Sequence, residues 1–140
     1  MNWKLDLNGM LGTERKRLSR AQQEEAIFQK FLNQEVIPAY TQITKELSKY
    51  KRDVVVRNTG TAALLSVRYE NAEEITFRVF KRDLPSGFVP YAEVRTKERK
   101  GLKIKTTEMN FHDGTYTMDD VKQDDVLKMF MTAYRTTHEN

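Results

Sequence analysis

The spacing of apolar residues follows a helical period in one long stretch near the start of the chain. Between residues 19 and 50 apolar side chains recur every three or four residues, which is typical of one face of an amphipathic helix. Its members are Phe28, Leu32, Val36, Tyr40, Ile43, Leu47 and Tyr50. Ser19 and Gln22 have the spacing of a capping box at the start. Pro38 lies inside the pattern, and proline removes a backbone donor and crowds the preceding turn. We therefore predict a helix over 19–50, kinked near Pro38.

Between residues 53 and 111 the period changes to two, which predicts strands with one buried face. Alternating or short apolar runs occupy residues 54–56, 63–69, 75–80, 89–97 and 102–107. Residues that favour turns separate them at 58–60, 70–74, 84–87 and 99–101. Connections this short join strands that are antiparallel neighbours. The pattern therefore predicts a five-stranded antiparallel meander.

A second helical pattern ends the chain and completes the predicted fold. Val126, Met129, Phe130, Ala133 and Tyr134 have helical spacing, and four aspartates precede them where a helix N-terminus favours carboxylates. We predict a helix over 117–137. Two helices about 10–12 Å wide cover a five-stranded sheet once. The expectation is one α+β domain, residues 1–140, with both helices on one face of the sheet.

The first eighteen residues carry a different signal. Trp3, Leu5 and Leu7 alternate with polar residues, and Gly9 and Gly12 interrupt the pattern. The alternation fits a short edge strand, so residues 1–18 are expected to be an extended or flexible arm. Such an arm offers one way to cover the sheet face that the helices leave open.

Composition and charge exclude several classes of protein. The chain has 140 residues, 39% of them hydrophobic and 31% charged, which is typical of a folded globular domain. It lacks cysteine, and with it disulfides and thiolate metal sites. It has neither an apolar run long enough to span a bilayer nor the apolar stretch of a secretory signal. We therefore expect a cytoplasmic protein with no membrane contact.

The net charge of +4 is unevenly distributed. Basic residues outnumber acidic ones before residue 105, and acidic residues outnumber basic ones after it. This asymmetry indicates either an anionic partner or attraction between the last helix and the rest of the chain.

The open sheet face is the candidate binding surface. Pairing Leu64 with Phe80 and Phe80 with Tyr91 places an apolar row across three predicted strands, with Arg78 facing Glu93. A block of four basic residues lies beside it: Arg95, Lys97, Lys103 and Lys105. Aromatic residues beside basic ones suit a protein partner or a nucleic acid, since bases stack and phosphates pair with cations. The simpler interpretation is a solvated face.

Catalytic chemistry has little support in the sequence. Neither a phosphate-binding glycine loop nor a nucleophile beside a base is recognisable, and we predict no cofactor, no metal and no catalytic residue. An enzyme based on carboxylates such as Glu70, Glu73 or Glu93 is the remaining catalytic alternative. The leading hypothesis is a small non-catalytic protein that binds a protein partner, or a second copy of itself, through the open face or the long helix. Nucleic-acid binding through the basic block is the alternative.

Overall fold

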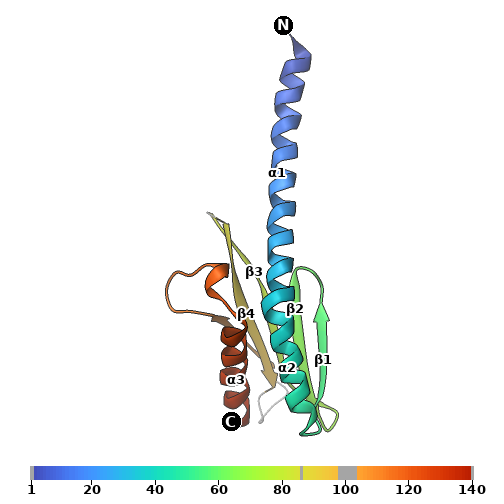
Figure 1. Ribbon diagram of the computed structural model, residues 1–140, viewed down its shortest axis with the longest axis vertical. Helices are drawn as coiled ribbons and strands as arrows, with labels where there is room; N and C mark the ends of the chain where they lie inside the picture. The colour runs from blue at the N-terminus through green and yellow to red at the C-terminus, as the bar shows by residue number, and fades with distance from the viewer. Residues whose placement is uncertain (1, 86, 98–103, 140) are drawn as a thin grey trace.

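The computed structural model describes residues 2–85, 87–97 and 104–139 (Figure 1). Its helices and strands, in chain order, are α1 (Trp3–Phe31), a π-helical turn (Leu32–Val36), α2 (Ile37–Ser48), β1 (Asp53–Asn58), β2 (Ala62–Tyr69), β3 (Ala72–Leu84), β4 (Gly87–Lys97), β5 (Ile104–Asn110), a 3₁₀ turn (Met118–Asp120) and α3 (Gln123–Glu139). The predicted α+β fold, with a long helix, a meander and a C-terminal helix, is confirmed.

The five strands form one antiparallel sheet in the order β1-β2-β3-β4-β5. α2 and α3 lie side by side on one face, which we call the covered face, and the opposite face is the open face (Figure 1). The β2–β3 connection has only two residues, Glu70 and Asn71, both with positive φ. This geometry matches the right-handed twist of the flanking strands. The hairpin predicted at 99–101 lies outside the described residues.

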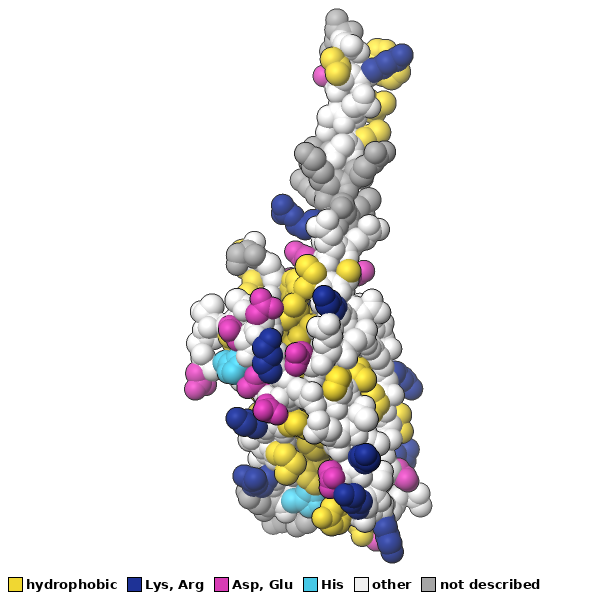
Figure 2. All heavy atoms as spheres, in the orientation of Figure 1, with side chains coloured by type: hydrophobic (Ala, Val, Ile, Leu, Met, Phe, Trp, Pro, Cys, Tyr) yellow, Lys and Arg dark blue, Asp and Glu magenta, His cyan; other side chains and the backbone are white. Residues whose placement is uncertain are grey.

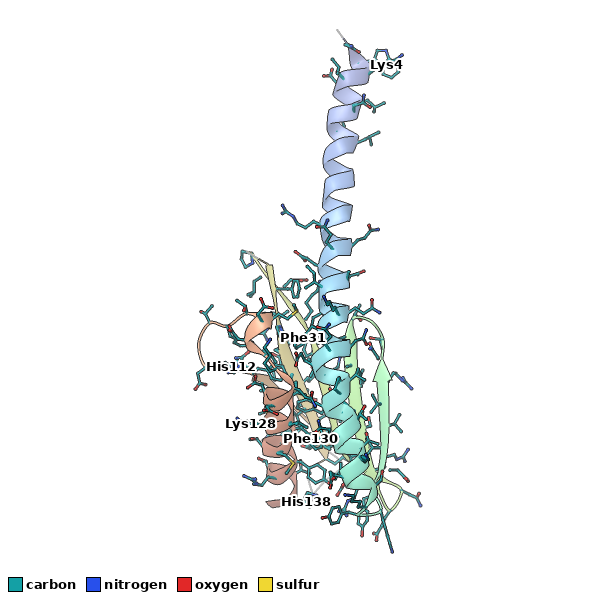
Figure 3. The ribbon with its side chains drawn as sticks, viewed as in Figure 1. Lys4, Phe31, His112, Lys128, Phe130 and His138 are labelled. Atoms are coloured by element: carbon teal, nitrogen blue, oxygen red, sulfur yellow. The ribbon has the colours of Figure 1, made fainter. Side chains whose placement is uncertain are left out.

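The core fills the space between the helices and the covered face. Phe28, Leu32, Val36 and Tyr40 from the long helix are almost fully buried, and they meet Leu65, Val67, Phe77 and Val79 of the sheet. Phe77 contacts Tyr40 on one side and Phe130 of α3 on the other, each edge to face. Figure 3 shows Phe31 and Phe130 directed toward this interior. The apolar faces of the helices and of the strands therefore pack together into one core layer.

The long helix carries a π-helical turn in place of the predicted kink. The turn ends just before Pro38, and the N–H of Ile37 bonds the carbonyl of Leu32, five residues earlier. Such a wide turn accommodates a residue that cannot join the regular ladder. It also leaves Leu32 and Val36 both fully buried. The two helical segments continue one another across the turn (Figure 1).

Residues 3–18 belong to α1, so the predicted extended arm and edge strand are wrong. The helix begins at Trp3 and continues through position 19, where a capping box was predicted. It projects away from the sheet, with the N-terminus at its far end (Figure 1). The open face is therefore not covered by the Trp3–Leu5–Leu7 segment. We call residues 3–19 the helical arm.

The C-terminal helix begins later than its sequence pattern predicted. Thr117 and Asp120 form a capping box, but it closes only the 3₁₀ turn. Val121 then takes an extended conformation and is fully buried. α3 starts at Gln123, whose N–H donates to the Glu35 carboxylate at 2.8 Å.

Candidate functional site

The open face brings together most of the apolar row predicted from the sequence. Phe80 pairs with Tyr91, and Arg78 pairs with Glu93, as predicted. Leu64 lies opposite Arg78, two residues from its predicted partner Phe80. The shift arises because the β2–β3 turn has two residues and a bulge follows at Val67/Arg68. Leu64 and Phe80 thus share the open face as diagonal neighbours.

Two guanidinium groups lie on the aromatic rings of this face. The Arg78 guanidinium is 4.4 Å from the centre of the Phe80 ring, and that of Arg82 is 4.2 Å from the Tyr91 ring. The two rings themselves are 3.6 Å apart between centres. Tyr91 is only 8% exposed. The arginine side chains therefore shield ring surface that a stacking ligand requires.

Acidic residues neutralise the arginines of the open face. Three ion pairs join different strands: Arg78–Glu93 at 3.9 Å and Arg95–Glu73 at 3.1 Å link β3 with β4, and Arg82–Glu108 at 2.7 Å reaches from β3 across β4 to β5. Burial raises the pKa of the Glu73 carboxyl, but hydrogen bonds from Thr76 and Arg95 outweigh it, and the net pKa is lowered. Glu73 is consequently ionised beside Arg95 at neutral pH.

The predicted basic block does not form one cluster. Arg95 and Lys97 lie on the open face, whereas Lys105 pairs with Thr96 and so shares the opposite, covered face. There it lines a hollow of about 210 Å³ between β5 and α3. Lys103 lies outside the described residues. Lys97 pairs with Ile104, one residue away from the register that a three-residue hairpin at 99–101 requires.

The helical arm exposes several apolar side chains to solvent. Trp3, Leu7, Met10 and Leu11 are 63%, 44%, 73% and 52% exposed. At about 100° per residue these four lie within one arc of roughly 100°. Figure 2 shows hydrophobic side chains along the projecting segment. The arm therefore has an apolar face, composed of Trp3, Leu7, Met10 and Leu11.

The apolar face of the arm continues the helix face that packs on the sheet. Phe28 and Leu32 fall on the same side of the helix by the same angular count. Nearer the sheet this side is buried in the core, and on the arm it is exposed. Leu5 is also 67% exposed, but it lies about 170° from the middle of the apolar face.

The arm is long for a helix without tertiary support. It spans about 25 Å at ~1.5 Å per residue, and it contains Gly9 and Gly12, each costing ~1 kcal/mol relative to alanine in a helix interior. Helices of this length are marginal in water when nothing packs against them. Arg20 and Glu24 lie beside the sheet, where they line a hollow with Leu84 and Gly87 at the β3–β4 hairpin. A partner that covers the apolar face would supply the missing support.

The carboxylates singled out from the sequence are engaged in pairs or turns. Glu73 and Glu93 pair with Arg95 and Arg78, and Glu70 lies in the β2–β3 turn. One hollow of about 280 Å³ holds two other carboxylates, Glu35 and Asp119. Glu35 accepts the Gln123 N–H. Within the described ranges, no three His, Asp or Glu side chains are grouped so as to hold a metal ion.

A polar cluster at the end of the molecule opposite the arm was missed by sequence reasoning. Arg52 donates two hydrogen bonds to Glu74, at 3.2 and 3.3 Å, and Tyr134 donates to the same carboxylate at 2.6 Å. His138 lies 3.4 Å from it, and Arg52 stacks 3.8 Å above the Tyr69 ring. No local spacing reveals the cluster, because its members come from the α2–β1 connection, β2, β3 and α3.

Comparison with known proteins adds no family or function. No family model matches the chain, and no curated protein or solved structure matches it either. In the part of the chain that the structure describes, none of the helices has the length and apolar character needed to cross a bilayer.

Proposed function

We propose that this chain is a non-catalytic interaction protein that binds a protein partner through the apolar face of its helical arm. The observation that carries the proposal is the exposure of Trp3, Leu7, Met10 and Leu11 on one side of a helical segment that projects away from the sheet (Figure 1). An amphipathic helix with anchors at such spacing typically binds an apolar groove or a second helix. The expected cytoplasmic location is part of the same proposal.

The charges of the open face and the apolar face of the arm together favour a protein partner over a nucleic acid. On the open face, Arg78, Arg82 and Arg95 are each paired with a glutamate, and ring surface is shielded by guanidinium groups. Nucleic-acid binding depends on cations free to replace counterions at phosphates. The apolar face of the arm, in contrast, offers an aromatic and aliphatic anchors of the kind that dominate protein interfaces.

The test compares the same substitution, leucine to aspartate, on opposite sides of the arm. Leu7→Asp places a carboxylate in the apolar face, and Leu5→Asp places one on the opposite side. Proteins captured from an extract of the native organism are quantified by mass spectrometry for both variants and the original chain. We expect the specific partner to be lost, by about tenfold or more, with Leu7→Asp and retained with Leu5→Asp. Equal capture by both variants would refute the proposal.

A further inference from the structure

β1 is an outer strand with one edge that is unpaired in the described sheet. It lies at one margin of the sheet, with β2 as its only neighbour in the described strand order (Figure 1). Edge strands are commonly blunted by like-charged residues, by proline or by a bulge. β1, with the sequence Asp-Val-Val-Val-Arg-Asn, has no proline, its two charged residues are of opposite sign, and its register with β2 is regular throughout. Val55 and Val56 are 52% and 39% exposed.

The sequence of β1 is complementary to itself in the antiparallel direction. When two copies pair about Val55, each Asp53 lies opposite the Arg57 of the other copy, and each Val54 lies opposite a Val56. Asp53 and Arg57 are exposed, and among the described residues neither has an ion-pair partner. Opposite charges and β-branched residues directly across two strands both stabilise pairing. We propose that the β1 edge is a self-association surface, at which two copies join into one continuous ten-stranded sheet.

The register of this pairing is specific. A shift of two residues in one direction places Arg57 opposite Lys51 of the other copy, a like-charge contact. A shift in the other direction places it opposite Val55. Both shifts lose the two Asp53–Arg57 pairs, so pairing about Val55 is favoured. A symmetry axis perpendicular to the sheet then leaves the helices of both copies on the same face and directs the two helical arms in opposite directions.

The other edge of the sheet does not share this property. β5 reads Ile-Lys-Thr-Thr-Glu-Met-Asn, and pairing it with itself about Thr106 places Lys105 opposite Thr107 and Glu108 opposite Ile104. Neither contact joins opposite charges. We therefore assign the second copy to β1 rather than β5. The assignment does not depend on the proposed function of the arm, which lies on a different element.

A charge exchange across the strand tests the pairing in the full-length protein. Sedimentation equilibrium is measured on the original chain, on Arg57→Asp, on Asp53→Arg and on the double variant. We expect a dimer with a dissociation constant on the order of micromolar for this short interface. Each single variant brings like charges together and is expected to weaken it by about tenfold or more. The double variant restores opposite charges and is expected to recover the dimer, which loss of folding cannot explain. The control Lys105→Glu, near the β5 edge, is expected to leave the constant unchanged.

A disulfide provides a second test of the register. The chain has no cysteine, so Val55→Cys introduces one thiol that faces its own copy across the axis. We expect Val55→Cys to form a covalent dimer under mild oxidation, and Ile104→Cys in β5 to stay largely monomeric. A monomeric original chain at 100 micromolar, about a hundred times the expected constant, would overturn the proposal. So would equal crosslinking at the two positions or failure of the double variant to recover the dimer.

Discussion

At the scale of single residues, the Glu74 carboxylate of β3 joins two parts of the fold that are distant in the sequence, the α2–β1 connection and α3. Its side chain is 16% exposed, it accepts hydrogen bonds from Arg52 and Tyr134, and it lies 3.4 Å from the His138 ring nitrogen. Burial alone raises the pKa of Glu74, but hydrogen bonds from Arg52 and Tyr134 outweigh it and lower the pKa. The charged form is thus the one that holds β3, α3 and the α2–β1 connection together.

Replacing Glu74 by glutamine is expected to destabilise the protein by about 2–4 kcal/mol. The amide nitrogen cannot accept the hydrogen bond that Arg52 donates to the second Glu74 oxygen, and the mostly buried Arg52 loses its counter-charge. Urea unfolding at pH 7 measures the effect. Glu46→Gln is the matched control, since Glu46 pairs with Lys49 on the exposed surface and such pairs contribute less than about 1 kcal/mol. Equal destabilisation by the two substitutions would contradict the role of Glu74.

The raised pKa of Tyr134 leads us to expect that the protein loses stability in alkaline solution. Burial, together with its hydrogen bond to the Glu74 carboxylate, raises the pKa of Tyr134 from 10.0 to about 12. Between these values the unfolded chain loses the phenolic proton before the folded protein does, so this contribution is complete below pH 10 and falls as the pH rises to 12. The stability difference between the original chain and Tyr134→Phe should therefore narrow from pH 9 to pH 12. Urea unfolding measures this difference in the free energy of unfolding, and the same value at pH 9 and pH 12 would contradict the prediction.

At the scale of elements, the sequence correctly predicted the helix and strands whose apolar residues repeat with a clear local period. The core stripe from Phe28 to Ile43 and the five strands have unambiguous spacing, and both are confirmed. The arm was missed because Trp3, Leu5 and Leu7 fit a period of two, while Trp3, Leu7, Met10 and Leu11 fit a helix equally well. Gly9 and Gly12 are unfavourable in a helix interior and so favoured the extended arm over the helix. The prediction of one basic block was wrong because the register of β5 against β4 differs by one residue, which moves Lys105 to the other face of the sheet.

The arm and the sheet-packed part of the protein are expected to be energetically separate. The described side chains of residues 2–12 lie in solvent, so little packing is lost when they are removed. A chain lacking residues 2–12 should unfold with a midpoint within about 2 °C of the original, since a change near 0.5 kcal/mol moves the midpoint by only a few degrees. Thermal unfolding by circular dichroism measures it. A drop of ten degrees would show that the arm packs on the rest of the protein in solution.

At the scale of the whole molecule, the fold separates two surfaces with different chemistry. The arm projects its apolar face beyond the sheet (Figures 1 and 2), and β1 leaves a self-complementary strand along one margin. A dimer formed through β1 would carry two arms, and two linked binding sites raise the effective affinity for a partner that also presents two. Sequence alone revealed neither surface, because each depends on which side of an element tertiary packing leaves uncovered.

The most direct test of the binding surface is photo-crosslinking at two positions of the arm. Met10 lies in the apolar face and Leu5 on the opposite side, and both are strongly exposed. Each is replaced in turn by a photoreactive amino acid, and the full-length protein is irradiated in an extract of the native organism. We predict a discrete protein adduct from position 10 that is absent from position 5. The same adducts from both positions, or none from either, would contradict the proposal that the apolar face of the arm binds a protein partner.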